Sequence, residues 1–384
     1  MPSWRSASRI GAVPDPLMEI LCEVRNSLAC VTLNRPAALN ALSLGMVEEL
    51  RAALRRFAGD PGIRAVLLRG AGEKAFCAGG DVRALYDSYH GAGTLHQDFF
   101  VSEYPLDYLL HCFPKPYVAL MDGIVMGGGM GIAQGSRLRI VGDRTRMAMP
   151  EVAIGFFPDV GGSYFLSRLP GALGTFLALT GTQIRAADAL YVCLADYYLP
   201  APAMQQLQSE LDCLAWSGEH GDSSRADLER LLGRLAVDAG EPPLAKLRAA
   251  IDAHFAAASV GELLASLECE TRPEYAQWAQ ETRKLLGARS PTMLAVTMRQ
   301  LRLGRSMSFA DCLRMELGMV RQCFVHGDFM EGVRAVIVDK DNAPRWQPQR
   351  IEAVTTASVD AIFHDPWAGG AHPLANLEGE GRCN

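Results

Sequence analysis

Short apolar segments, glycine-rich turns and amphipathic helices alternate along residues 17–185, and this alternation limits the chain to an α/β core. Residues 17–34 hold two β-prone runs on either side of positions 25–27, which predicts a hairpin. A helix is expected to begin after Ser43, a suitable N-cap. Its apolar positions recur at helical spacing: Met46, Val47, Leu50, Leu54 and Phe57. Neither a β-sandwich nor a helical bundle has this alternation.

The same alternation continues along the chain and includes a second cycle. The apolar runs Ile63–Leu68, Pro116–Met121 and Leu138–Val141 predict buried strands. Gly70–Gly80 is expected to be a glycine-rich loop, and Gly127–Gly131 opens a helical stretch.

The pattern changes after residue 186. Residues 203–290 are rich in Ala, Leu, Glu and Arg at helical spacing, whereas residues 340–384 contain scattered prolines. The expected division is an N-terminal disordered extension at 1–16, an α/β core with the active site at 17–200, a helical region at 201–350 and an irregular tail at 351–384.

Composition excludes several classes of protein. Lys and Arg number 37 against 43 Asp and Glu, a net charge of -6, so nucleic acid is a poor partner. The ten cysteines never form Cys-x-x-Cys, so neither a zinc module nor a disulfide framework is indicated. No apolar run reaches the roughly 18 residues of a membrane span, and the basic N-terminus, with Arg5 and Arg9, is too short to predict a targeting signal. A cytoplasmic protein is expected.

The two glycine-rich segments have several interpretations. Gly127–Gly131 lacks the Gly-Lys-Ser/Thr ending of a P-loop and the spacing of a dinucleotide fingerprint. Two such segments after short strands can place two backbone N–H groups side by side as an oxyanion hole. Alternatively, both are only tight turns.

Two carboxylates stand in apolar surroundings. Glu151 and Asp159 lie among Met, Ile, Phe, Val and Pro, where a carboxylate is costly unless it is partnered or used. Either could also be structural: Glu151 as a first-turn acid and Asp159 as a turn residue. The eight histidines are dispersed without ligand spacing, and no Gly-x-Ser-x-Gly motif accompanies them. A carboxylate-based, metal-free mechanism remains.

At these residues the chain resembles the crotonase (enoyl-CoA hydratase/isomerase) superfamily, and within it the 3-hydroxyisobutyryl-CoA hydrolase branch. The resemblance runs from about residue 17 to 350 and is specific in the order of its motifs. These are LNRPAALNAL (33–42), AFCAGGDVRALY (75–86), PYVALMDGIVMGGGMG (116–131), MPEVAIGFFPDVGG (149–162), SPTMLAVTMRQL (290–301) and DFMEGVRAVIVDKDNAPRW (328–346).

The resemblance implies a spiral of repeated ββα units, with a helical C-terminal region that shapes the acyl pocket and often an oligomer contact. It also implies an acyl-CoA substrate whose thioester oxygen is held by two backbone N–H groups, those of Gly80 and Gly128. Coenzyme A would be part of the substrate, with no separate cofactor. The Asn34-Arg35-Pro36 loop is similar to the segment that lines the adenine site of the family.

The same motifs separate hydrolases from hydratases. Glu151 matches the second of the two catalytic glutamates of hydratases, but Gly131 stands at the position of the first. Asp159 replaces a glycine of typical hydratases, and Glu103 matches a substrate-contacting glutamate of the hydrolase branch.

The expected activity is therefore hydrolysis of 3-hydroxyisobutyryl-CoA to 3-hydroxyisobutyrate and CoA, a step of valine catabolism. Glu151 acts as nucleophile or general base, while Asp159 and Glu103 position the acyl hydroxyl or the water. One alternative is an enoyl-CoA hydratase or isomerase that uses Asp159 as its second acid/base group. The other is a non-catalytic acyl-CoA-binding protein.

Overall fold

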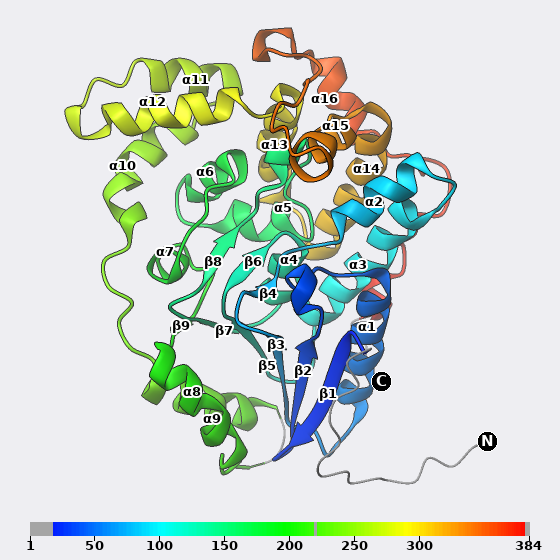
Figure 1. Cartoon of the computed structure of the whole chain (residues 1–384), viewed down its shortest axis with the longest axis vertical. Coiled ribbons are helices and arrows are strands. Elements are labelled where there is room, and N and C mark those ends of the chain that lie inside the picture. Colours follow the sequence, from blue (N-terminus) through cyan, green and yellow to red (C-terminus); the bar gives the residue numbers. More distant parts are fainter. Residues whose placement is uncertain (1–17, 219–220, 381–384) are drawn as a thin grey trace.

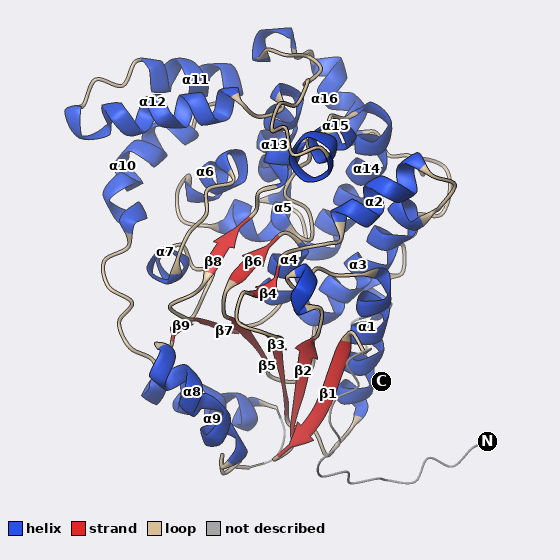
Figure 2. Cartoon of the chain, in the orientation of Figure 1, coloured by secondary structure: helices blue, strands red, loops and turns tan. Residues whose placement is uncertain are grey.

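Two sheets of mainly parallel strands form the centre of the molecule, and helices surround them (Figures 1 and 2). The computed structural model describes residues 18–218 and 221–380, so the extension expected at 1–16 lies outside the described residues. No described helix is long and apolar enough to cross a membrane.

The larger sheet has six strands in the order β1-β2-β3-β5-β7-β9. These are β1 (Ile20–Arg25), β2 (Leu28–Leu33), β3 (Ala65–Gly70), β5 (Tyr117–Met121), β7 (Leu138–Val141) and β9 (Tyr197–Tyr198). Strands β1 and β2 form the predicted antiparallel hairpin, in which Asn26 and Ser27 take positive φ angles of 47° and 59°. All other pairs in this sheet are parallel.

The smaller sheet has three parallel strands, β4 (Ala75–Cys77), β6 (Ile124–Met126) and β8 (Arg146–Ala148). Each follows a strand of the larger sheet along the chain, which confirms the predicted repetition of ββα units. The prediction of a continuous loop at Gly70–Gly80 was wrong, because β4 lies inside it. A strand of three residues is too short to show a period of two.

The α-helices of the described residues are α1 (Leu44–Gly59), α2 (Val82–His90), α3 (Leu95–His111), α4 (Gly128–Gln134), α5 (Gly162–Phe165), α6 (Leu173–Thr180), α7 (Ala186–Tyr191), α8 (Ala201–Asp212), α9 (Asp222–Leu235), α10 (Pro243–Phe255), α11 (Val260–Glu268), α12 (Pro273–Gly287), α13 (Pro291–Gly304), α14 (Phe309–His326), α15 (Phe329–Val333), α16 (Thr356–Phe363) and α17 (Leu377–Glu380). The 3₁₀-helices are η1 (Pro36–Ala38), η2 (Glu151–Ile154), η3 (Leu166–Arg168) and η5 (Ile351–Ala353), and a π-helical turn, η4, covers Arg334–Val338.

Helix α1 forms as its sequence predicts. Ser43 Oγ accepts a hydrogen bond from the backbone N–H of Met46 and caps the helix. All five apolar positions named above are buried. Complete burial of a side chain such as Leu50 contributes about 1.5–3 kcal/mol, so this face fixes the helix to the core.

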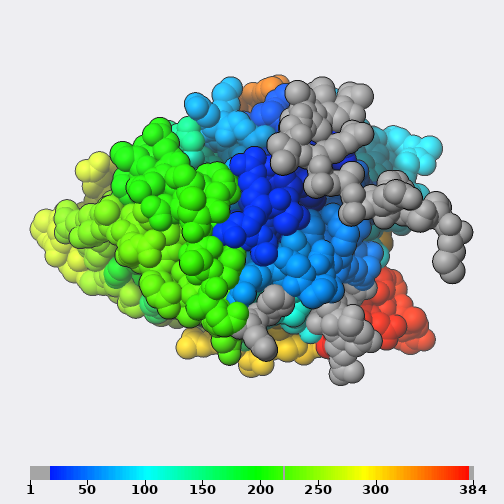
Figure 3. Space-filling model, turned by 90° about the horizontal axis from the view of Figure 1, so that it is seen from below, coloured from blue at the N-terminus to red at the C-terminus, as the bar shows by residue number. Residues whose placement is uncertain are grey.

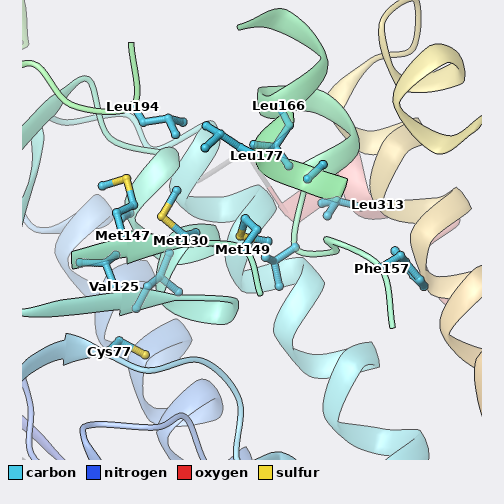
Figure 4. Packing of buried hydrophobic residues seen from close by; sticks show 14 of the residues in the cluster. Cys77, Val125, Met130, Met147, Met149, Phe157, Leu166, Leu177, Leu194 and Leu313 are labelled. Atoms are coloured by element: carbon cyan, nitrogen blue, oxygen red, sulfur yellow. The ribbon is translucent and has the colours of Figure 1, made fainter. Parts of the chain in front are cut away.

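The hydrophobic core has two parts. In the larger part, the small sheet contributes Cys77, Val125 and Met147, and Met130 lies beside Val125 and Met147 (Figure 4). The smaller part lies between the larger sheet and helices α8 and α9. Seen from below, these two helices lie beside the N-terminal strands (Figure 3). There Asn26 Nδ2 donates to the carbonyl of Leu211 at 3.0 Å.

The C-terminal region is helical, as expected, but its tail is more ordered than the prediction of an irregular segment at 351–384. Helix α16 lies in this tail, begins at a capping box on Thr355 and packs on α14. Pro366 and Pro373 come after the helix, where they do not interrupt it.

Candidate active site

The candidate site lies where the three strands of the smaller sheet end. Gly80, Gly128 and Glu151 each follow one of the strands β4, β6 and β8 by two or three residues. Because these strands are parallel neighbours, their carboxyl ends meet at one edge. The fold therefore brings together three residues that are far apart in the sequence.

The backbone of the two glycine loops is closely packed. A Cβ atom added to Gly128 would lie 3.4 Å from the backbone nitrogen of Gly80. Within residues 18–218 and 221–380, neither of these two N–H groups donates a hydrogen bond. Gly127 has a φ of +50°, which disfavours any side chain at this turn. Two adjacent free donors match the requirements of an oxyanion hole.

Two glutamates lie directly against these glycines. Glu103 comes from the middle of α3, and its Oε1 lies 2.5 Å from the position of a Cβ added to Gly128. Glu151 begins η2, and its Oε1 lies 2.8 Å from the position of a Cβ added to Gly127. Both carboxyl groups therefore face the glycine loops.

Asp159 lies in the loop between η2 and α5. It is only 5% exposed, and its Oδ2 accepts a hydrogen bond of 2.9 Å from the hydroxyl of Tyr104. Sequence spacing alone did not show that Asp159 and Glu151 meet, whereas in the structure the charge of Asp159 raises the pKa of Glu151.

Burial dominates the electrostatics of the site. It raises the pKa values of Glu103 and Glu151 well above their ordinary range, and the charge of Asp159 raises both further. Burial also raises the pKa of Asp159 to about 7, although the Tyr104 hydrogen bond opposes this shift. Among the described residues, no cation lies close enough to these carboxyl groups to oppose the upward shifts of their pKa values.

A stability prediction follows from the raised pKa of Asp159. Its ordinary pKa is 3.8, so between that pH and about 7 the folded state binds more protons than the unfolded state. Stability is therefore lost as the pH rises through this window, and the full penalty applies above it. Asp159→Asn carries no charge and is expected to be more stable than wild type at pH 8 by about 1–3 kcal/mol. Urea unfolding at pH 8 and pH 4 should show this gain shrinking at the lower pH; a less stable variant at pH 8 would contradict the assignment.

A fourth buried acid, Asp107, lies one helical turn beyond Glu103 on α3. No hydrogen-bond partner within the described residues satisfies either of its carboxylate oxygens. A Cβ added to Gly131 would lie 2.9 Å from Asp107 Oδ1 and 2.6 Å from Val160 Cβ. The space beside Gly131 is therefore already filled.

The sequence did not single out Tyr104 and Asp107. The four-residue interval between Glu103 and Asp107 was the available signal, because it places both acids on one face of a helix. The Asn34-Arg35-Pro36 loop is tied to the site: Arg35 forms an ion pair of 3.1 Å with Asp81, the neighbour of Gly80.

Among residues 18–218 and 221–380, no histidine forms a hydrogen bond or ion pair with Glu103, Glu151 or Asp159. His254 is buried between Ser266 and Glu270, at 2.6 and 2.8 Å, where it links α10 to the end of α11. In the part of the chain that the structure describes, no cluster of His, Cys, Asp and Glu is arranged to hold a metal ion.

Known proteins of one family are similar to most of this chain. The sequence profile of the enoyl-CoA hydratase/isomerase family matches residues 28–363. A mitochondrial 3-hydroxyisobutyryl-CoA hydrolase of Xenopus laevis is 39% identical over 335 residues, which cover 87% of this chain and 85% of that protein. A probable 3-hydroxyisobutyryl-CoA hydrolase of Arabidopsis thaliana is 36% identical, over 90% of this chain and 91% of its own length.

Two solved structures are similar over nearly the whole chain. A carnitinyl-CoA dehydratase from Mycobacterium thermoresistibile has a TM-score of 0.83 and 38% identity, covering 94% of this chain and 99% of that one. An enoyl-CoA hydratase from Rhodobacter sphaeroides has a TM-score of 0.79 and 37% identity, covering 91% and 98%.

Proposed function

Because this chain belongs to the enoyl-CoA hydratase/isomerase family and has its crotonase fold, we propose that it hydrolyses an acyl-CoA thioester, with 3-hydroxyisobutyryl-CoA as substrate. This choice is supported by the relatives named as hydrolases of that thioester, because the chain matches them over most of their length. The reaction would belong to valine degradation.

The observation that carries the proposal is the crowding at Gly131. Hydration of an enoyl-CoA needs one group to activate water and another to protonate the α-carbon. The position of the first hydratase glutamate is occupied here by Gly131, and Asp107 and Val160 fill the space where its side chain would begin. A site with Glu151 but without that partner is better suited to hydrolysis than to hydration.

The proposed chemistry uses the groups at the strand ends. The N–H groups of Gly80 and Gly128 would stabilise the oxyanion that forms when the thioester carbonyl is attacked. Glu151 would either attack the carbonyl carbon itself or remove a proton from the attacking water. In both routes the C–S bond breaks, the thiolate of CoA takes up a proton, and water supplies the hydroxyl of the acid product. Coenzyme A is part of the substrate, and we propose no further cofactor.

Asp159 and Glu103 are assigned to substrate positioning. An ionised carboxylate accepts hydrogen bonds, and Asp159 already accepts one from Tyr104, which leaves lone pairs for a substrate hydroxyl. Glu103 lies over Gly128, close to where the thioester oxygen would be held.

Enoyl-CoA hydration or isomerisation is the second candidate. The two solved structures named above as a dehydratase and a hydratase favour it, at 38% and 37% identity. In that case Asp159 would be the second acid/base group. A non-catalytic acyl-CoA-binding protein is the third candidate, and the buried carboxyl groups facing the glycine loops argue against it.

The substrate assignment predicts the phenotype of Asp159→Gly. Wild type should strongly prefer a 3-hydroxyacyl-CoA over the matching unsubstituted acyl-CoA, because the unsubstituted ester leaves Asp159 unpaired. The variant should reduce this preference at least about tenfold, or about 1.4 kcal/mol. The measurement is kcat/KM of both proteins for both esters, with hydrolysis monitored as thiol release. If Asp159→Gly lowers kcat/KM equally for both esters, their ratio stays unchanged, and Asp159 does not bind the substrate hydroxyl.

The cytoplasmic location and a contact between copies of the chain remain predictions from the sequence. The animal relatives are mitochondrial proteins, so fractionation of the native cells is the direct test of location. Sedimentation of the purified chain would test the oligomer.

A further inference from the structure

The loop that carries Asp159 has a strained backbone. Val160 and Gly161 follow Asp159 with φ angles of +51° and +85°. The left-handed region is a genuine outlier for a β-branched residue, and such a conformation costs about 1–3 kcal/mol. The loop therefore depends on the surrounding structure to stay in this shape.

Glu316, from α14, supplies one part of that support. Its side chain is completely buried and accepts two hydrogen bonds from the loop backbone: from Gly161 N–H at 2.8 Å and from Ser163 N–H at 2.9 Å. The two oxygens of the one carboxylate thus bind the residues that follow Val160. The N–H groups are satisfied without a ligand or a cation.

Gln300, from α13, supports the same loop from the other side of Asp159. Its Nε2 donates to the carbonyl oxygen of Pro158 at 2.6 Å and to Ser163 Oγ at 2.8 Å. Gln300 is also completely buried. Buried polar side chains therefore fix the backbone immediately before and after Asp159.

Helices α13 and α14 also pack tightly on this loop. A Cβ added to Gly304 would lie 2.2 Å from the carbonyl oxygen of Ser163, and one added to Gly161 would lie 2.3 Å from the ring of Phe309. The loop cannot shift toward the helices without displacing them.

We propose that Glu316 and Gln300 are positioning residues that hold Asp159 at the distance from Glu151 and the glycine loops that substrate selection requires. Helices α13 and α14 then act on the reaction through the Asp159 loop, without touching the substrate. The activity test of this inference rests on the proposed function, whereas the hydrogen-exchange test does not.

Glu316→Gln is the informative substitution. It keeps the length and volume of the side chain, but its amide NH₂ faces one of the two backbone N–H groups that the carboxylate accepts. That N–H loses its partner, and the strained loop loses part of its support. We expect kcat/KM for a 3-hydroxyacyl-CoA to fall about tenfold, while the rate for the unsubstituted ester changes less than about threefold.

A double-mutant cycle separates positioning from general destabilisation. The four proteins are wild type, Glu316→Gln, Asp159→Gly and the double variant, each assayed with both esters by thiol release. If Glu316 acts through Asp159, Glu316→Gln should change the selectivity less than about twofold once Asp159 is absent. An equal effect of Glu316→Gln in both backgrounds overturns the inference. Asp227→Asn is the control, since this buried carboxylate on α9 also accepts hydrogen bonds at both oxygens, two from Ser217 and one from Arg230. It should leave the selectivity unchanged.

A second measurement is independent of activity. Hydrogen exchange of the Gly161 and Ser163 amides in the full chain should become at least about tenfold faster in Glu316→Gln, and unchanged exchange overturns the inference. If Glu316→Gln does not fold, Gln300→Met takes its place in both measurements with the same expected direction. If the wild-type protein releases no thiol from either ester, the proposed function is wrong. The exchange rates would still decide whether Glu316 holds the loop.

Discussion

Replacing Glu151 with glutamine is expected to lower turnover of the thioester at least about a hundredfold while acyl-CoA binding is largely retained. The amide keeps the volume of the side chain but can neither attack the carbonyl nor accept a proton from water. Glu151 faces Gly127 and is almost completely buried, so a water molecule from bulk solvent cannot readily replace it. Steady-state kinetics and calorimetric titration of the CoA ester measure the two quantities.

Asp188→Asn is the control for this variant. Asp188 is also a buried carboxylate, and it accepts a hydrogen bond of 2.8 Å from the backbone N–H of Leu244, at the start of α10. Its amide variant should retain turnover near wild type. Near-normal turnover in Glu151→Gln would show that another group carries the chemistry.

Gly128→Ala keeps the backbone N–H group but is expected to reduce the rate about 10²- to 10³-fold, a decrease as large as the loss of one oxyanion donor, because the methyl group keeps the thioester oxygen away from that donor. The added methyl group would lie 2.5 Å from Glu103 Oε1 and 3.4 Å from the nitrogen of Gly80. It therefore displaces Glu103 and crowds the position of the thioester oxygen. The decrease should exceed what the change in thermal stability explains.

Gly233→Ala, in the middle of α9, is the matched substitution. No atom lies within 4 Å of its added Cβ, so it should fold and turn over as wild type does, with a small gain in helix stability. A folded Gly128→Ala protein with unchanged kinetics would show that the glycine loop is only a turn between packed elements.

Much of the core could be predicted from the sequence because its elements carry a local signal. Helix α1 has a cap and an apolar stripe, and the hairpin β1-β2 has two β-prone runs around a turn. Strand β4 was missed because three residues cannot display a period. Helix α16 was missed because the prolines around it dominate the composition of the tail.

In the candidate site, too, residues in local motifs could be predicted, whereas contacts between distant segments could not. Gly80, Gly128 and Glu151 could be named from motifs, and the parallel strands of the small sheet explain why they meet. The hydrogen bonds to the Asp159 loop could not be predicted, because Glu316 lies 155 residues from Gly161 along the chain. Only the packing of α13 and α14 on the core brings such partners together. The roles of the site residues and the domain boundaries remain predictions.

Product analysis tests the central claim most directly. The purified chain would be incubated separately with 3-hydroxyisobutyryl-CoA and with a 2-enoyl-CoA, while a thiol reagent records free CoA and the absorbance of the conjugated enoyl thioester is followed. We expect stoichiometric release of CoA and 3-hydroxyisobutyrate from the first substrate, and little loss of enoyl absorbance with the second. Rapid loss of enoyl absorbance without release of free thiol would contradict the account and identify the chain as a hydratase.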